Sequence, residues 1–367
     1  MIAIVSSNHY PDDERIFHKQ IQSLTAKKFK IIYFTRSNSD LDLSNEFIRH
    51  HNFNCHVDIK TYVKSIYNII FNLAELSHIQ IHETDLLPLF KKIKLKKNNF
   101  ITIYDVHENM AALYRTFSNR IKPIKELAIY LRHLQENRYL KYVDKIILAN
   151  HPISTNPYID MGIPISIIEN FPELKYFKMS SISVRKPNSI IYHGHLGPER
   201  GIYDLVKAMV SVVNDLKNAK LTLIGTFRTK KFRSQIYSLI NELNLEQSIE
   251  ILDQIPHVEI WTYLTKHKVG VVPFRETPLT VENTPTKLFE MMIAGLEVVS
   301  SDLPPIRHFV NSSIHWSVPG DALSLSGAII NACKTSDHSK ADKNKKLIKE
   351  NYNWEKNKDR YLSLFYS

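Results

Sequence analysis

Two glutamates, Glu282 and Glu290, stand at the ends of the stretch ENTPTKLFE, with seven residues between them. Thr284 and Pro285 are typical of a helix start, with threonine as N-cap and proline at the first helical position. The helix is expected to end at Gly295. The free N–H groups of its first turn would attract an anion, and the two carboxylates would accept hydrogen bonds from hydroxyl groups. The pattern therefore predicts a site for a nucleotide-sugar.

A second interpretation needs no ligand, because two glutamates at this spacing also occur by chance and the helix has an ordinary amphipathic face. The surroundings favour the functional interpretation. The apolar run VGVVPF precedes the helix and LEVVSS follows it, so a strand is expected on each side. Ligands in parallel α/β sheets bind at the carboxyl ends of the strands.

The stretch PTKLFEMMIAGLEVVSSDLPPIR resembles the signature of family-4 retaining glycosyltransferases of the GT-B fold, which includes two glutamates separated by seven residues. The resemblance extends over nearly the whole chain. IIYHGHLGPERGIYDLVKAM is similar to the strand, phosphate loop and helix of these enzymes, and YNWEKNKDRYLSLF is similar to their closing helix. IYDVHEN and PDDERIFHKQIQSL resemble N-terminal segments of members that build bacterial surface polysaccharides.

Strands alternate with helices along the chain, which predicts parallel sheets, and 367 residues indicate two domains at roughly 150 residues each. The resemblance implies an α/β GT-B fold, in which two Rossmann-like domains face each other across a cleft. We expect an N-terminal acceptor-binding domain at 1–168, a linker at 169–186 and a donor-binding domain at 187–345. A C-terminal helix at 346–367 is expected to cross back to the N-terminal domain.

The hydrophobic periodicity predicts the individual elements. In the N-terminal half, strands are expected at 2–6, 30–35, 78–82, 100–105 and 145–150, and helices at about 13–27, 61–75, 85–96 and 123–141. In the C-terminal half, strands are expected at 189–193, 220–224, 249–253, 269–273, 297–300 and 314–318. Helices are expected there at 202–217, 229–243, 257–266 and 321–333, besides the helix that contains Glu290.

The segment GHLGPERG, residues 194–201, follows a predicted strand and precedes a predicted helix. It is neither a dinucleotide fingerprint nor a Walker loop, but a glycine such as Gly194 lets the backbone approach a phosphate closely. Arg200 would bind a diphosphate and neutralise the charge that grows on the leaving group. Related enzymes usually have arginine where this chain has His195, which leaves one fixed cation in the loop. Lys287 could supply the missing charge.

The resemblance implies a role for each residue of the site. Glu282 would bind hydroxyls of the donor sugar, Glu290 would bind the ribose hydroxyls, and His107 would contact the donor sugar or its phosphate. It thus implies Glu282, His107 and Arg200 as catalytic residues. Further donor-binding residues are expected in the loops near these positions and near the nucleotide base: Asn283, Thr284 and Ile255. In similar enzymes the acceptor attacks the face of the sugar from which the phosphate departs, and the departing phosphate itself takes the acceptor's proton. The resemblance therefore implies no protein nucleophile.

We predict no metal requirement. Asp40 and Asp42 match the Asp-x-Asp pattern of the other large glycosyltransferase fold, but they lie in a Ser/Asn-rich loop rather than after a buried strand. The tetrad HETD at 82–85 lacks the spacing of a zinc site. Asp13 and Arg15 stand where related sequences have Asp and Arg before Ile-Phe, and they either bind the acceptor or form a structural ion pair.

The formal net charge of +11 is spread over both halves of the chain, and no nucleic-acid-binding signature is present. A local exception is KKIKLKK at 91–97, whose five lysines either form a solvated helix end or bind anionic lipid. The aromatic and basic stretch from Tyr114 to Lys122 could add an interfacial anchor. No apolar run reaches the roughly 18–20 residues of a membrane span, and the first residues do not resemble a signal peptide. Cys55 and Cys333 are expected to be free thiols in a reducing cytoplasm.

We therefore expect a cytoplasmic, metal-independent retaining glycosyltransferase, peripheral on the inner face of the plasma membrane. It would move a sugar from a UDP- or GDP-sugar to a lipid-linked or glycan acceptor in the assembly of a surface polysaccharide such as O-antigen or capsule. Two alternatives stay open: a GT-B sugar-nucleotide epimerase, and a degenerate glycosyltransferase-like subunit that binds without transfer. A nucleic-acid-binding protein is a more distant alternative.

Overall fold

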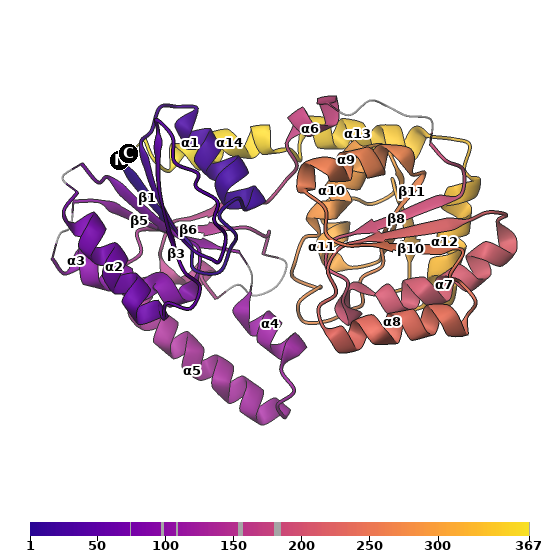
Figure 1. Ribbon diagram of the computed structural model, residues 1–367, viewed down its shortest axis with the longest axis horizontal. Helices are drawn as coiled ribbons and strands as arrows, with labels where there is room; N and C mark the ends of the chain where they lie inside the picture. The colour runs from indigo at the N-terminus through magenta and orange to yellow at the C-terminus, as the bar shows by residue number, and fades with distance from the viewer. Residues whose placement is uncertain (74, 97–98, 108, 153–156, 180–184, 367) are drawn as a thin grey trace. The chain divides into compact units, whose positions relative to one another are not determined.

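The computed structural model describes residues 1–73, 75–96, 99–107, 109–152, 157–179 and 185–366. The chain forms two compact units: unit 1 comprises Met1–Asn170 and Lys356–Ser367, and unit 2 comprises Phe171–Glu355. Each unit is built on one parallel sheet with its own hydrophobic core (Figure 1). None of the described helices is long and apolar enough to cross a membrane.

Unit 1 contains seven parallel strands in the order β3-β2-β1-β4-β5-β6-β7. Its central strands are short apolar runs because helices cover both faces of such a sheet, and every residue of the first strand, IAIV, is buried. The strand order changes direction at β1, so the ends of β1 and β4 form the switch point of this sheet. The strands are β1 (Ile2–Val5), β2 (Ile31–Arg36), β3 (Ile48–Phe53), β4 (His78–Ile81), β5 (Ile101–Val106), β6 (Lys145–Leu148) and β7 (Ile165–Ile167).

The helices of unit 1 begin with a π-helical segment, Glu14–Ile21, which continues into α1. The π-helical turn was not expected from the sequence, which predicts one regular helix over 13–27. Figure 1 shows α5 extending away from the sheet, with α4 before it. The helices are α1 (Gln22–Thr25), α2 (Ile59–Phe71), α3 (Leu87–Lys94), α4 (Met110–Phe117) and α5 (Lys122–Leu140), with 3₁₀ turns at Thr84–Leu86 and Ile159–Met161.

Unit 2 contains six parallel strands in the order β10-β9-β8-β11-β12-β13, and its switch point lies between β8 and β11. The expected strands in this half of the chain are all present within about one residue. They are β8 (Ser189–His193), β9 (Lys220–Ile224), β10 (Ile249–Leu252), β11 (Val269–Val272), β12 (Glu297–Ser301) and β13 (His315–Ser317).

Helices of unit 2 pack their apolar stripes on this sheet. In α7 the apolar face includes Leu205, Met209 and Val212, which follow the helical period and are fully buried. The helices are α6 (Leu174–Met179), α7 (Ile202–Asp215), α8 (Lys230–Glu242), α9 (His257–Lys266), α10 (Thr286–Ile293), α11 (Pro304–Arg307), α12 (Ala322–Lys334) and α13 (Ser339–Glu350), with a 3₁₀ turn at Pro198–Arg200.

Three elements of the N-terminal half were not predicted. The edge strand β3, IRHHNF, is polar and half-exposed, so its hydrogen bonds to β2 rather than its hydrophobicity define it. The short helix α4 begins at Asn109, whose side chain accepts hydrogen bonds from the N–H groups of Ala111 and Ala112. The third, β7, is only a three-residue edge strand.

The segment expected as a linker, 169–186, is partly structured. Unit 2 begins inside it at Phe171, whose ring packs 4.9 Å from that of Phe289 in the core. Helix α6 follows and packs against α9. The linker prediction therefore overlooked a helix whose apolar residues belong to the core of unit 2.

The closing helix expected at 346–367 is two helices, α13 and α14 (Trp354–Ser363). The chain breaks between them because the amide of Asn353 donates hydrogen bonds to the carbonyl oxygens of Ile348 and Lys349 and so caps the end of α13. From Lys356 onward α14 belongs to unit 1. The predicted return of the chain to the N-terminal domain is thus confirmed.

Candidate active site

In unit 2, the loop GHLGPERG lies against the end of β11. Its last residue, Gly201, has φ +69°, and a Cβ there would come 1.7 Å from the carbonyl oxygen of Pro273. Only glycine fits at this contact. Since β8 and β11 are neighbours in the sheet, the loop is held at the switch point, where α/β sheets bind their ligands.

The amine of Lys287, from the first turn of α10, lies beside this loop. Its Nζ donates a hydrogen bond to Tyr192 Oη (3.0 Å), and a Cβ on Gly194 would come 2.6 Å from Nζ. Burial, followed by the charge of Arg200, lowers the pKa of Lys287 well below its ordinary value, although nearby carboxylates act in the opposite direction. An anionic ligand at the loop would favour the protonated amine.

Two arginines share the buried carboxylate of Glu199. Arg228 Nη2 lies 2.9 Å and Arg200 Nε 3.4 Å from Glu199 Oε1, and the Arg200 guanidinium lies 4.6 Å from the centroid of the Phe274 ring. An arginine stacked on an aromatic ring is oriented and keeps donors for a phosphate. With Lys287, the site has three basic side chains rather than the single fixed cation expected from the loop sequence.

His195 adds no fixed charge to this group. Partial withdrawal from solvent, together with the charges of Arg228, Lys287 and Arg200, lowers the pKa of His195 below its ordinary value of 6.5. Its backbone is held in place, since Tyr192 Oη donates a hydrogen bond to the His195 carbonyl oxygen (2.7 Å). A neutral imidazole at this position could still donate a single hydrogen bond to a phosphate oxygen.

Glu290, on α10, is only 4 % exposed and lies between two histidines. Its Oε1 is 2.6 Å from His257 Nε2, and its Oε2 is 3.4 Å from His193 Nε2. His193 ends β8 and His257 begins α9, so three elements converge on this carboxylate. The sequence analysis gave neither histidine a role: His193 lies in the quoted stretch IIYHGHLGPERG but was not singled out, and His257 belongs to no motif. The available signal was their position next to the carboxyl ends of β8 and β10.

Glu282 lies in the turn that precedes α10. Its N–H donates to the carbonyl oxygen of Leu279 (3.3 Å), and the N–H of Asn283 donates to the same oxygen (3.1 Å). The helix begins at Thr286, one residue later than expected, with Pro285 rather than Thr284 as N-cap. The predicted placement of Glu282 in the loop and Glu290 on the helix is nevertheless confirmed.

The remaining residues that the sequence predicts for a donor site lie in two loops. Asn283 and Thr284 are each 9 % exposed in the loop before α10. Ile255 is half-buried in the loop between β10 and α9. The contacts of these residues with a donor stay predictions.

In unit 1, the loops after β1, β4 and β5 bring three histidines together at the switch point. His82 Nδ1 lies 2.8 Å from His107 Nε2, and the rings of His9 and His107 are 4.6 Å apart. Although burial acts in the opposite direction, a hydrogen bond with Glu83 (2.7 Å) raises the pKa of His9. His107 thus lies after β5 as expected. His9 and His82 complete a cluster that the sequence analysis did not identify.

Arg15 and Asp13 have structural partners. Arg15 donates hydrogen bonds to both oxygens of Asp105 (2.9 and 3.3 Å) and to the carbonyl oxygen of Ile168 (2.8 Å), and it is 4 % exposed. Asp13 accepts hydrogen bonds from the N–H groups of Arg15 and Ile16 and caps the π-helical segment. The structure therefore favours the ion-pair alternative for Arg15 and identifies its partner as Asp105, which was not predicted.

The ligand atoms of His82, Asp105 and His107 lie within 4.8 Å of one another, close enough to share a metal ion. The oxygens of Asp105, however, already accept hydrogen bonds from Arg15 and from Gln20 Nε2 (2.6 Å). These donors occupy the carboxylate, so the three residues fit a hydrogen-bonded network better than a set of metal ligands.

Comparisons with known proteins agree with this architecture. Residues 177–354 match the family model "Glycosyl transferases group 1". HepE from Anabaena, solved in complex with UDP and glucose, has 12% sequence identity and a TM-score of 0.75, and the match covers 100% of this chain and 99% of that one. Sucrose-phosphate synthase from Thermosynechococcus elongatus has 18% identity and a TM-score of 0.74, with 99% and 98% covered.

A glycosyltransferase from Rickettsia africae has 14% identity and a TM-score of 0.68, with 99% and 97% covered. No curated protein sequence gives a significant match. The similarity to solved structures establishes the fold: two Rossmann-like units with parallel sheets, as in GT-B enzymes. The chain thus has the GT-B fold and contains, in residues 177–354, a group 1 glycosyltransferase domain.

Proposed function

We propose that this protein is a retaining glycosyltransferase of family 4, which transfers a sugar from a nucleoside-diphosphate sugar to a glycan or lipid-linked acceptor in the assembly of a cell-surface polysaccharide. One observation carries the proposal. Within a group 1 domain, Lys287 lies against Gly194 of the glycine loop, three basic side chains surround that loop, and Glu290 lies at the same edge of the sheet.

The donor is a UDP- or GDP-sugar. Its diphosphate would bind at Gly194 and Gly197, next to Arg200 and the amine of Lys287, because charge-assisted hydrogen bonds from these groups are stronger than neutral ones. The ribose hydroxyls would donate to Glu290. The name of the HepE complex, which includes UDP and glucose, supports a donor of this type.

In the reaction, the bond between the anomeric carbon and the diphosphate oxygen breaks while the acceptor hydroxyl oxygen bonds to the same face of that carbon. The leaving phosphate takes the acceptor proton. Arg200 and a protonated Lys287 would stabilise the negative charge that grows on the diphosphate without a metal ion. Glu282, from the turn before α10, would hold hydroxyls of the sugar that moves, and His107 would contact the same donor.

We expect the acceptor to be a molecule in a membrane, because helix α5 presents an exposed apolar face that could bind a membrane surface. Four of its apolar residues are exposed at intervals of three and four, on one face of the helix: Ile124, Leu127, Leu131 and Leu134. Exposed basic residues, including Lys122 and Arg132, accompany them. An amphipathic helix of this kind binds an anionic bilayer by burying its apolar face while its cations attract the lipid headgroups.

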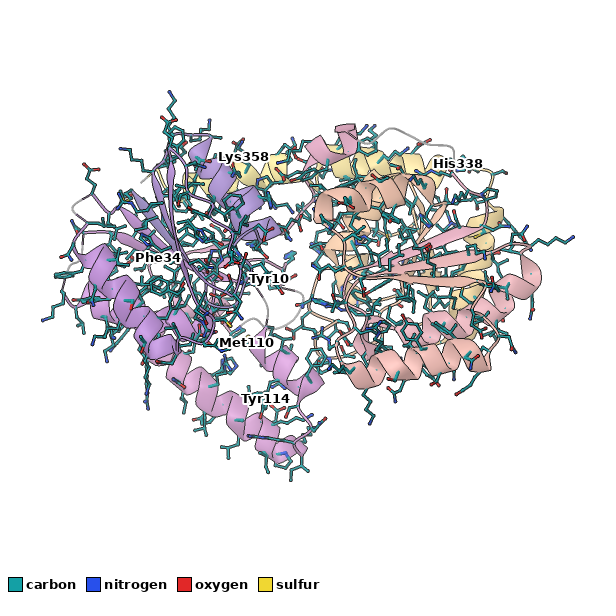
Figure 2. All side chains as sticks on the ribbon, viewed as in Figure 1. Tyr10, Phe34, Met110, Tyr114, His338 and Lys358 are labelled. Atoms are coloured by element: carbon teal, nitrogen blue, oxygen red, sulfur yellow. The ribbon has the colours of Figure 1, made fainter. Side chains whose placement is uncertain are left out.

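Neighbouring segments match this assignment. Figure 2 labels Met110 and Tyr114 on α4, and Met110 is among the exposed apolar side chains. The predicted patch KKIKLKK begins on α3, which packs against α5. Lys91, Lys92 and Lys96 are exposed, Lys94 pairs instead with Asp144 (2.7 Å), and Lys97 lies outside the described residues. This arrangement favours peripheral attachment to the inner face of the plasma membrane.

The test combines binding and transfer. A thermal-shift panel of UDP, GDP, TDP, CMP and ADP identifies the base, since a ligand at one hundred times its Kd stabilises by about 2.7 kcal/mol. Labelled donors of that base are then offered with a membrane lipid extract, in the presence and absence of excess EDTA, and with Lys287→Met as control. We expect label in the lipid fraction from the unmodified chain only, with or without EDTA.

Other outcomes would identify other functions. A donor converted to an isomer without an acceptor indicates the epimerase. Nucleotide binding with no transfer to lipid or glycan indicates a binding subunit. Transfer to a soluble sugar phosphate is the second candidate activity, supported by structural neighbours named sucrose-phosphate and trehalose-phosphate synthases. Turnover restored only by a divalent ion would contradict the metal-independent mechanism.

A further inference from the structure

A chain of buried polar side chains runs through unit 1 from Asp105 to His107. Its contacts are Gln20 Nε2 to Asp105 Oδ2 (2.6 Å), Gln80 Nε2 to Gln20 Oε1 (2.9 Å), Gln80 Nε2 to His82 Nε2 (3.2 Å) and His82 Nδ1 to His107 Nε2 (2.8 Å). The first four residues of this chain are fully buried or nearly so. Each contact needs one donor and one acceptor, so the direction of one bond fixes the next.

Asp105 sets the direction at one end. It is fully buried, and Arg15 donates hydrogen bonds to both of its oxygens (2.9 and 3.3 Å). This pairing holds the pKa of Asp105 well below its ordinary value in spite of burial, which acts in the opposite direction. An ionised carboxylate is only an acceptor. Gln20 must therefore present its NH₂ group to Asp105 and its carbonyl oxygen to Gln80.

Gln80 is fixed by the same reasoning. Its NH₂ group has to face Gln20 Oε1, and its carbonyl oxygen accepts a hydrogen bond from Tyr361 Oη (2.9 Å) of α14. The second N–H of that amide points to His82 Nε2. His82 Nε2 must then be the unprotonated ring nitrogen, so the ring proton of the neutral His82 lies on Nδ1.

The last contact transfers this constraint to His107. Asp105 Oδ2 lies 3.6 Å from both His82 Nδ1 and His107 Nε2, which is too long for a hydrogen bond, whereas the two ring nitrogens are 2.8 Å apart. Since His82 Nδ1–H donates across the shorter contact, His107 Nε2 accepts, and the ring proton of His107 lies on Nδ1. Within the described parts of the chain, His107 Nδ1 has no hydrogen-bond partner, and the side chain is 15% exposed. We infer that His82 is a positioning residue that fixes His107 in the Nδ1–H tautomer, so that His107 meets the ligand as a hydrogen-bond donor.

The inference rests on the proposed function only for the identity of the ligand. The N–H at His107 Nδ1 needs a hydrogen-bond-accepting oxygen on the ligand, such as a sugar hydroxyl oxygen or a phosphate oxygen. It cannot remove a proton from the acceptor hydroxyl through that nitrogen. His107 is thereby assigned to binding and orienting the nucleotide-sugar. This agrees with a reaction in which the leaving phosphate takes the proton.

The tautomer can be measured without substrate. In the protein labelled with ¹⁵N-histidine, two-bond and three-bond ¹H–¹⁵N correlations in NMR spectra distinguish a protonated from an unprotonated ring nitrogen. The signals that disappear in His107→Gln belong to His107. We expect protonated Nδ1 in the unmodified chain and loss of that single form in His82→Asn, whose amide can donate or accept. A proton on Nε2 of His107 in the unmodified chain overturns the inference.

Two further variants keep the result interpretable. Gln80→Glu replaces the donor that faces His82 by an acceptor and should reverse both rings; should its buried charge prevent folding, His82→Asn decides alone. His78→Gln is the matched control, because His78 is a buried histidine at the start of β4, the strand that ends directly before His82. It should leave the His107 signals unchanged, and a change as large as in His82→Asn would mean a general loss of structure instead of tautomer control.

The functional arm uses the same variants with the donor found by the nucleotide panel. His82→Asn should lower kcat by about 10- to 100-fold, the usual effect of removing a group that orients a functional ligand, with unchanged affinity for the free nucleotide. If His82→Asn alters the tautomer of His107 but turnover stays normal, the assignment of His107 as a hydrogen-bond donor to the ligand is overturned. If no transfer is found with any donor while the tautomer is as expected, the proposed function fails and the assignment of His82 stands.

Discussion

The amine of Lys287 lies in the space that a side chain at position 194 would need, since a Cβ on Gly194 would come 2.6 Å from Nζ. Gly194 belongs to the loop after β8, and Lys287 belongs to the first turn of α10. The absence of a side chain on one residue therefore determines the position of the charge on the other. A diphosphate bound at the loop would meet the backbone and the lysine together.

Gly194→Ala should displace the lysine and weaken binding of the nucleoside diphosphate by about 10-fold, close to the loss of one hydrogen bond to a charged group. Calorimetry with UDP and GDP measures the effect. The φ of +105° at Gly194 adds backbone strain, so the matched control is Gly320→Ala, where φ is +76° and nothing lies within 4 Å of the new Cβ. Equal affinity in the two variants would mean that the contact with Lys287 has no role in binding.

Substitution of the two glutamates should affect different properties, nucleotide affinity for Glu290 and turnover for Glu282. Glu290→Gln should mainly weaken nucleotide affinity, because ribose hydroxyls bind equally in ground and transition states. Glu282→Gln should leave nucleotide affinity intact and lower turnover by about 10²-fold, on the scale of a lost transition-state contact. Calorimetry and transfer rates at saturating donor are measured for both. Similar losses of nucleotide affinity would show that Glu282 has been assigned the wrong role.

Nucleotide binding should take up protons. The pKa of Lys287 in the free protein is lowered well below its ordinary value, and a bound diphosphate would raise it again. Between the two values binding adds a proton to the amine, so affinity should fall as pH rises toward the ordinary lysine pKa of about 10.4. Calorimetry at pH 8 to 9 in buffers of different ionisation enthalpy detects the uptake. Lys287→Met should abolish it and His195→Gln should not; uptake that persists without the lysine excludes it as the source.

Attachment to anionic liposomes should depend on the exposed stripe of α5. Leu127→Glu combined with Leu131→Glu removes apolar area and adds negative charge, so binding to vesicles with phosphatidylglycerol should fall below detection in a sedimentation assay. Replacing Lys91, Lys92 and Lys96 by Gln tests the electrostatic part separately and should weaken binding while increasing its salt sensitivity. As a control, Tyr237→Glu changes an exposed aromatic residue of unit 2. The membrane assignment would be refuted if the leucine variant sedimented with anionic vesicles as well as the unmodified protein does. It would also be refuted if the unmodified protein bound neutral and anionic vesicles equally.

The protein should lose stability on mild acidification. The pKa of His82 is lowered to about 3 from 6.5 by burial, so its unfolded form binds a proton that the folded form rejects, and stability falls as pH drops from 6.5 toward 3. The pKa of Glu83 is lowered to about 2 from 4.5, although burial acts in the opposite direction. The hydrogen bond with His9 is the main cause that lowers the pKa of Glu83. Protonation of Glu83 therefore causes a second loss of stability as pH falls from 4.5 to 2. Urea unfolding between pH 7 and 5 should therefore show a decrease that His82→Asn reduces, with exposed His56→Gln as control. A flat profile would be incompatible with a buried neutral His82.

Much of unit 2 could be predicted from the sequence because its strands are continuous apolar runs and its glycines punctuate them. The same logic fails for β3, whose alternating polar residues form an edge strand only through pairing with β2. It fails again in the segment after Asn170, where serine, proline and basic residues indicate a linker although Phe171 and α6 pack into the core. Local composition does not report which distant surface a segment will cover.

For the site, the sequence located side chains that belong to motifs and missed those that converge only in three dimensions. Glu290 and Lys287 could be named from one short stretch. His257 is 33 residues away from Glu290 and comes within 2.6 Å of it, a contact that depends on the order of strands in the sheet. The same holds for Arg15, which was noted from its motif but whose partner, Asp105, lies 90 residues away.

The return of the chain to unit 1 has a consequence for biosynthesis. Unit 2 is one continuous stretch, Phe171–Glu355, whereas unit 1 also needs Lys356 and the residues after it. Tyr361 and Asn357 donate hydrogen bonds into the interior of unit 1, to Gln80 and to Glu169. During translation, domains generally fold in the order in which they emerge. Here the first unit to be synthesised is the last that can be completed: a nascent chain that ends before Lys356 can complete unit 2 but not unit 1.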